Sequence, residues 1–173
     1  TQGVSSAASD VYKRQVWAAR YLSMTENRRL IGSFTHGSMA NALLHGIGAQ
    51  VSHPDRQVIA LAGDGGLAMM LGELLTLTQN KLPVKTIVVN NSSLNFVELE
   101  MKAAGFVNYG TALDNPSFAA IAEAMGIFAR RVENSEDLPD AVREVLAHDG
   151  PALLDVVTER QELSMPPAIE ACL

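Results

Sequence analysis

Residues 57–91 read QVIALAGDGGLAMMLGELLTLTQNKLPVKTIVVNN, and this stretch decides the fold. The apolar run at 57–63 predicts a strand, residues 67–81 carry apolar side chains at helical spacing, and the Val/Ile-rich run at 84–91 predicts a second strand. Two strands joined through a helix form a βαβ unit, in which the strands run parallel. The stretch therefore predicts a parallel sheet with helices packed against it.

Helices and strands alternate along the rest of the chain as well. Helical spacing recurs at 16–24, 38–50, 95–102, 116–126 and 135–150, and runs typical of strands occur at 30–37, 128–133 and 151–159. Ser135 is expected to cap the helix that it begins. This alternation predicts the α/β class, with a doubly wound, mostly parallel sheet and helices on both faces.

The two ends of the chain differ from this pattern. Residues 1–15, TQGVSSAASDVYKRQ, are small and polar without periodicity, and they resemble an adapter-derived leader. We therefore leave them out of the predicted fold and interpret them as non-native. The predicted domain covers residues 16–167, and residues 168–173 are interpreted as a truncated tail.

The composition excludes several classes of protein. The 173 residues are 47% hydrophobic and 18% charged, which is typical of a globular domain. A net charge of −6 without clustered Lys and Arg argues against nucleic-acid binding. The single cysteine, Cys172, cannot form an internal disulfide, and no apolar run is long enough to span a membrane. We expect a cytoplasmic location.

Asp64 stands between glycines where the strand at 57–63 ends and the following helix begins. Ligands of parallel sheets bind at this edge, and a helix N-terminus favours a phosphate, which a carboxylate would repel unless a cation lay between them. Mg²⁺ fits, because it binds one or two protein oxygens together with phosphate oxygens and water. The next strand ends in Asn90 and Asn91, and neighbouring strands lie about 4.8 Å apart. Asp64 and this asparagine pair are therefore candidate ligands of one ion.

The sequence GDG, followed one helix and one strand later by NN, resembles the diphosphate-binding motif of thiamine-diphosphate-dependent enzymes. With VWAARYL, GSFTHGSMANAL, NNSSLNFVELEMKAAGF and GPALLDVV, the chain from residue 16 to 167 resembles the C-terminal cofactor domain of pyruvate oxidases. The resemblance is closest to the quinone-reducing, flavin-carrying pyruvate dehydrogenases. It implies that the complete protein decarboxylates pyruvate oxidatively to acetate and CO₂.

The resemblance implies which residues hold the cofactor. Asp64, the side-chain oxygen of Asn91 and the backbone carbonyl of Ser93 would bind Mg²⁺. Gly65 and Gly66 would offer backbone N–H groups to the diphosphate.

Two further segments would contact the cofactor, by the same resemblance. Gly37, Ser38 and Met39 would face the aminopyrimidine, with the Gly37 carbonyl accepting from its amino group and Met39 supporting the bent cofactor. The loop after the second strand would border the active site, with Phe96 as a candidate substrate contact. This loop comprises Ser92, Ser93, Leu94, Asn95, Phe96 and Val97. The oxidase pattern has glycine where this chain has Asn95.

Other parts of such an enzyme are implied by resemblance only. The activating glutamate comes from a pyrimidine-binding domain, usually of another subunit, so no catalytic residue is assigned here with certainty and the isolated chain is expected to be inactive. FAD would bind mainly elsewhere. The complete protein would be a homo-oligomer, a tetramer by resemblance, with a quinone at the inner face of a membrane as a further partner.

Four alternatives stay open. An acetolactate synthase of the same superfamily shares the motif, and a non-catalytic cofactor-binding domain shares the fold. GDGGLA also fits the dinucleotide pattern G-x-G-x-x-A at Gly63, Gly65 and Ala68, although Asn90 stands where that pattern expects an acidic residue. A purely structural turn does not predict the asparagine pair.

Several other side chains are interpreted as structural. Glu98 and Glu100 are expected to face solvent or a domain interface. His36 is expected to be non-catalytic, and Met69 and Met70 are expected to fill the core.

Overall fold

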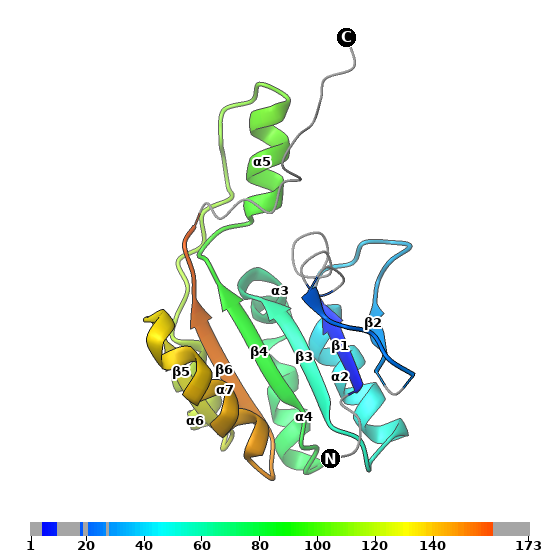
Figure 1. Ribbon diagram of the computed structural model, residues 1–173. Helices are drawn as coiled ribbons and strands as arrows, with labels where there is room; N and C mark the ends of the chain where they lie inside the picture. The colour runs from blue at the N-terminus through cyan, green and yellow to red at the C-terminus, as the bar shows by residue number, and fades with distance from the viewer. Residues whose placement is uncertain (1–4, 10–17, 19–20, 27, 161–173) are drawn as a thin grey trace.

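A computed structural model describes residues 5–9, 18, 21–26 and 28–160. In this part of the chain six strands form one sheet in the order β2-β1-β3-β4-β6-β5, and every neighbouring pair is parallel. Helices lie on both faces of the sheet (Figure 1). The predicted α/β fold with a parallel, doubly wound sheet is confirmed.

The elements have the following bounds. The strands are β1 (Ser5–Ser9), β2 (Leu30–Gly32), β3 (Val58–Gly63), β4 (Lys85–Asn90), β5 (Phe128–Val132) and β6 (Ala152–Val157). The helices are α2 (Asn41–Ser52), α3 (Asp64–Met69), α4 (Leu74–Gln79), α5 (Asn95–Ala103), α6 (Phe118–Ala124) and α7 (Leu138–Ala147). Two short 3₁₀ helices are η1 (Leu71–Glu73) and η2 (Ser135–Asp137).

The sheet separates two apolar cores. On β6, Leu153 packs into the larger core with residues of α2, α4 and α6, whereas Leu154 packs into the smaller core with residues of α7. Successive side chains of a strand point to opposite faces, so both faces of the sheet are covered. Figure 1 shows α7 and α2 on opposite sides of it. Burial on both faces explains why the central strands have almost continuous apolar runs.

Two predicted helices differ in detail from the structure. The helix expected at 67–81 is divided into α3, η1 and α4, because Met70 has φ −127 and Gly72, a poor helix former, follows it. Ser135 does not cap the later helix, which is a wrong prediction. It lies in η2, and α7 begins after Asp137 without a side-chain cap but with proline in its first turn.

The first strand lies in the segment that the sequence pattern places outside the fold. In β1, Ala8 pairs with Ile31 of β2 on one side and with Ala60 of β3 on the other. Leaving residues 1–15 out of the fold is therefore wrong. SSAAS lacks the β-branched residues that mark a strand, and only pairing with its neighbours reveals it. That the segment is a non-native leader stays a prediction, as do the domain bounds.

Other predicted segments fall on the ends of the described ranges. Most of the helix expected at 16–24 lies outside the described residues, although Ala18 and Tyr21 are helical. The tail at 168–173 lies outside them entirely. Among the described helices, none has the length and apolarity needed to cross a bilayer.

Two glycines of α2 test how closely this helix packs on the sheet. A Cβ atom on Gly46 would lie 3.2 Å from the Ala60 Cβ and 3.3 Å from the Val84 Cγ1, whereas a Cβ on Gly48 meets nothing within 4 Å. Alanine stabilises a helix by roughly 0.5–1 kcal/mol relative to glycine, so Gly48→Ala should raise the free energy of unfolding. Gly46→Ala should lower it by about 1 kcal/mol through overpacking. Urea denaturation measures both, and equal effects would contradict close packing of α2.

Candidate functional site

The parallel register of β3 and β4 places Asp64 beside Asn91. Gly63, the last residue of β3, pairs with Val89 of β4, so the residues that follow both strands leave the sheet together. The Asp64 carboxylate is 2% exposed. Its Oδ1 accepts from the Gly65 N–H at 2.9 Å, and its Oδ2 accepts from the Asn91 N–H at 3.2 Å. The two predicted halves of the motif therefore meet at one buried carboxylate.

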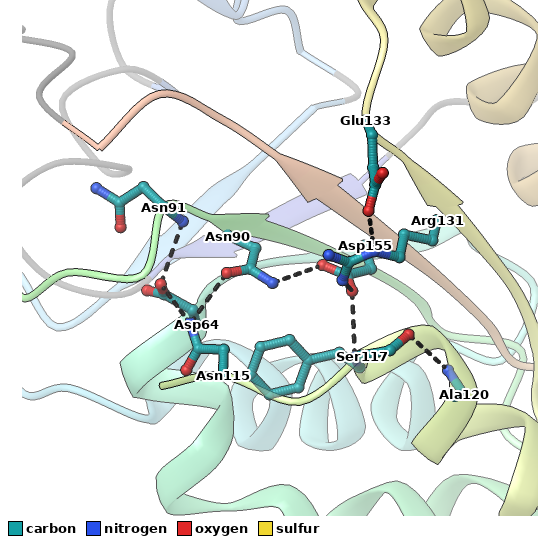
Figure 2. A network of polar contacts seen from close by, with 10 residues as sticks. Asp64, Asn90, Asn91, Asn115, Ser117, Ala120, Arg131, Glu133 and Asp155 are labelled. Atoms are coloured by element: carbon teal, nitrogen blue, oxygen red, sulfur yellow. Dashed lines mark hydrogen bonds and ion pairs between the residues drawn. The ribbon is translucent and has the colours of Figure 1, made fainter. Parts of the chain in front are cut away.

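Asn115, from the loop before α6, links the Asp64 carboxylate through Asn90 to the carboxylate of Asp155. Its Nδ2 donates to Asp64 Oδ2 at 2.9 Å and to Asn90 Oδ1 at 2.9 Å. Asn90 Nδ2 in turn donates to Asp155 Oδ1 at 3.1 Å. Figure 2 shows Asn115 and Asn90 lying between the two carboxylates. Polar contacts thus run from β6 across β4 to the start of α3.

Asp155 is completely buried on β6 and is neutralised there by an arginine. Its Oδ2 accepts from Arg131 Nη1 at 2.6 Å and from the Phe118 N–H at 3.1 Å. Arg131 also donates to Glu133, and that hydrogen bond first, then the charge of Asp155, raises the pKa of Arg131. The ion pair therefore fixes the Asp155 carboxylate behind Asn90.

Sequence reasoning missed Asn115 and Asp155. Asp155 did leave a signal, because a charged residue inside the buried run ALLDVV requires a partner. Asn115 left none, since asparagine in a loop before proline is an ordinary turn residue.

The loop after β4 is held by the segment before Asn115. Ser92 has φ 53, which is rare for a residue other than glycine, and its carbonyl accepts from the Leu113 N–H at 3.0 Å. The Leu94 N–H donates to the Thr111 carbonyl at 2.8 Å, and Ser93 forms an isolated antiparallel β-bridge with Ala112. These contacts fix the backbone at Ser93, whose carbonyl is a predicted metal ligand.

Glu98 is buried, contrary to expectation. It is 3% exposed, and it accepts from Ser93 Oγ at 2.9 Å and from Lys102 Nζ at 2.8 Å. The hydrogen bonds from Lys102 and then from Ser93 lower the pKa of Glu98. No local pattern predicts this burial, because Ser93 lies before the helix and Lys102 lies one turn along it. Glu100 is exposed, as expected.

The predicted segment of Gly37, Ser38 and Met39 lies close to the turn at Gly65. A Cβ on Gly65 would lie 2.8 Å from Leu94 Cδ2 and 3.5 Å from Met39 Cε, so these two side chains flank the turn after β3. Gly37 has φ 61, a conformation that glycine adopts without strain. The Ser38 N–H donates to Ser33 Oγ at 3.1 Å. Met39 and Leu94 therefore bring their two segments next to the turn at Gly65. The role of these segments in binding the cofactor stays a prediction.

Other predicted residues lie differently around this point. Asn95 is buried, and its Nδ2 donates to the Arg160 carbonyl at 2.9 Å, which ties the start of α5 to the chain after β6. Val97 is exposed on α5, and this helix lies beyond the carboxyl ends of β4 and β6 (Figure 1). Phe96 is half-buried and Gly66 is buried within α3. Met69 is 63% exposed, so its interpretation as core filling is wrong.

The donors present fit a hard cation. The described residues contain no group of three or more His, Cys, Asp and Glu side chains able to hold a metal. A single carboxylate, Asp64, instead accepts from the backbone N–H of Asn91, and the side-chain Oδ1 of Asn91 accepts from the Ser93 N–H at 3.3 Å. One carboxylate with neutral oxygens suits Mg²⁺ that is shared with phosphate oxygens. The residues therefore fit Mg²⁺ with a diphosphate.

Comparison with protein families gives a match over residues 10–156 to the family described as "Thiamine pyrophosphate enzyme, C-terminal TPP binding domain". This chain belongs to that family. Thiamine pyrophosphate is another name for thiamine diphosphate, so the cofactor class expected from GDG and NN is confirmed at the family level.

Relatives of this domain include three curated proteins. YdaP of Bacillus subtilis, whose name describes it as thiamine pyrophosphate-containing, is 37% identical over 148 residues, 86% of this chain and 26% of that protein. Acetolactate synthase 2, chloroplastic, of Nicotiana tabacum is 35% identical over 175 residues, 96% of this chain and 26% of its own length. The acetolactate synthase isozyme 2 large subunit of Escherichia coli is 32% identical over 160 residues, 91% of this chain and 29% of its own length. The chain thus spans about a quarter of these relatives.

Replacing Glu98 by glutamine should destabilise this domain at pH 7 and have less effect in acid. The folded-state pKa of Glu98 is lowered. Its contribution is therefore complete above the unfolded-state pKa of about 4.3 and is lost as the pH falls through the folded-state value. Urea denaturation of Glu98→Gln and wild type between about pH 7 and pH 3 measures the difference. Glu100→Gln, at an exposed position, is the control, and a Glu98 effect independent of pH would contradict the assignment.

Proposed function

We propose that this domain binds the diphosphate and Mg²⁺ of thiamine diphosphate in an acetolactate-synthase-like enzyme that acts on pyruvate. The observation that carries the proposal is the buried Asp64 carboxylate, which begins α3 beside Asn91 at the carboxyl edge of the sheet. Two of the relatives described above are named acetolactate synthases. Their names favour this activity over the pyruvate oxidase reaction that the sequence motifs suggest.

The residues of this chain would bind and orient the cofactor. Asp64, the Asn91 side-chain oxygen and the Ser93 carbonyl would hold Mg²⁺, and the N–H groups of Gly65 and Gly66 would face the diphosphate. Burial strengthens the attraction between the Asp64 carboxylate and the cation, because the local dielectric constant is low. When bound, the cofactor supplies the chemistry that cleaves the bond between the carboxylate and the 2-oxo carbon of the substrate.

The other two segments would shape the rest of the site. Gly37, Ser38 and Met39 would face the aminopyrimidine, and the Met39 side chain already lies against the turn at Gly65. The Leu94 side chain, from the loop after β4, also packs against the turn at Gly65. The half-buried Phe96 and the exposed Val97 would border the space for substrate. An activating glutamate would come from a pyrimidine-binding domain, on another subunit of a homo-oligomer.

Pyruvate oxidase or quinone-linked pyruvate dehydrogenase is the second candidate. The stretch NNSSLNFVELEMKAAGF supports it by resemblance. This activity would require FAD and an electron acceptor, bound mainly by other parts of the complete protein.

Replacing Asp64 by asparagine tests the metal assignment. The substitution keeps the size of the side chain and removes its charge, so Mg²⁺-dependent binding of thiamine diphosphate should weaken by at least about a hundredfold, because a buried charge pair is lost. Calorimetric titration of the complete enzyme measures the affinity. Asp140→Asn removes the same charge from an exposed position on α7 and should leave the affinity unchanged. Unchanged affinity in Asp64→Asn would exclude Asp64 as a ligand.

The products formed from pyruvate by the complete enzyme test the reaction. Acetolactate is expected. Acetate together with reduced flavin or quinone would establish the oxidase instead. Binding of thiamine diphosphate without turnover would indicate a non-catalytic protein.

A further inference from the structure

We propose that Asn115 is a positioning residue for the metal site: it fixes the orientation of the Asp64 carboxylate and thereby favours Mg²⁺ over larger cations. The inference rests on the proposed function, since it takes Asp64 as the Mg²⁺ ligand. It adds a residue that lies in none of the three segments of the predicted site.

The direction of each hydrogen bond in this network is determined by Asp155. A carboxylate can only accept, so the Asn90 amide must turn its Nδ2 towards Asp155 Oδ1, and its Oδ1 then faces the other way. That oxygen requires a donor, which is the Nδ2 of Asn115. Asn115 has two N–H bonds on this nitrogen, and the second is directed at Asp64 Oδ2. If the Asn115 amide were reversed, its Oδ1 would face two other acceptors, Asn90 Oδ1 and Asp64 Oδ2.

The backbone on both sides of Asn115 is anchored. Two residues before it, the Leu113 N–H donates to the Ser92 carbonyl at 3.0 Å, and three residues after it the Phe118 N–H donates to Asp155 Oδ2 at 3.1 Å. Ser117 caps α6 by accepting from the Ala120 N–H at 3.2 Å (Figure 2). A rigid loop therefore presents the Asn115 amide to Asp64, and the side chain has few alternative positions.

The ionic charge behind the network strengthens it. Asp155 forms an ion pair with Arg131 at 2.6 Å. Hydrogen bonds to ionised groups are shorter and stronger than those between neutral groups. The two asparagines consequently connect the Asp155 carboxylate, which is paired with Arg131, to the Asp64 carboxylate. Asn115 holds the Asp64 carboxylate through a neutral donor, which adds no cation that would compete with a metal.

A fixed orientation of the Asp64 carboxylate should matter more for the affinity of Mg²⁺ than for that of Ca²⁺. Mg²⁺ requires nearly ideal octahedral geometry with ligands at roughly 2.0–2.1 Å, whereas Ca²⁺ accepts six to eight oxygens at about 2.3–2.6 Å in flexible arrangements. Loss of the Asn115 hydrogen bond would let the Asp64 carboxylate rotate. Affinity for Mg²⁺ should therefore fall more than affinity for Ca²⁺.

The test uses the complete enzyme with saturating thiamine diphosphate, titrated separately with Mg²⁺ and with Ca²⁺. Asn115→Ala should weaken Mg²⁺ binding about tenfold or more, as removal of partners of metal ligands does. Ca²⁺ binding should weaken by a clearly smaller factor, so the ratio of the two affinities falls. Asn134→Ala, at an exposed asparagine between β5 and η2, is the matched control and should change neither affinity.

The outcomes separate this inference from the proposed function. Equal loss for both ions, or no loss, in folded Asn115→Ala would overturn the positioning role while leaving the function intact. Failure of the wild-type enzyme to bind Mg²⁺ with thiamine diphosphate would overturn both. If Asn115→Ala does not fold, as shown by its thermal melting curve, Asn115→Ser replaces it. Its hydroxyl has one donor for two acceptors, and an unchanged ratio of Mg²⁺ to Ca²⁺ affinity would overturn the proposal.

Discussion

The buried carboxylate of Asp64 is the constraint on which the carboxyl edge of this sheet depends. A charge removed from water costs several kcal/mol unless it is compensated. Backbone N–H groups of Gly65 and Asn91 and the Asn115 side chain supply that compensation from three different segments. Those segments can reach Asp64 only if β3 and β4 are parallel neighbours in the observed register. The order of the strands, the turn after β3 and the anchored loop before α6 together place the hydrogen-bond donors of the Asp64 carboxylate.

This arrangement explains why family membership alone does not determine the reaction. Acetolactate synthases and pyruvate oxidases would both need a site for diphosphate and Mg²⁺, and the proposed role of the residues around Asp64 and Asn91 would be the same in either enzyme. Selectivity for substrate and electron acceptor depends on groups around the reacting atoms. In the proposed site Phe96 and Val97 would border that space, and further contacts would come from other parts of the protein.

Sequence reasoning failed where a neighbour in space outweighs the local pattern. Glu98 looks like a solvent-facing residue of an amphipathic helix, yet Ser93 and Lys102 enclose it. SSAAS has weak strand propensity, yet pairing on both sides makes it β1. Ser135 is a good capping residue, but the helix begins later, near a proline that is well suited to a first turn. In each case a tertiary contact or a competing start signal decided the outcome.

The sequence by itself determined the βαβ unit, the parallel sheet and the pairing of Asp64 with Asn91. Each of these follows from hydrophobic periodicity and from residues joined by one helix and one strand, which a local pattern encodes. Only the tertiary structure decided that Asn115 and Asp155 complete the network. Asn115 lies 25 residues from Asn90 in sequence, and Asp155 lies 65 residues from it. Their meeting depends on β6 inserting between β4 and β5, and strand order is a property of the packed sheet, not of any single segment.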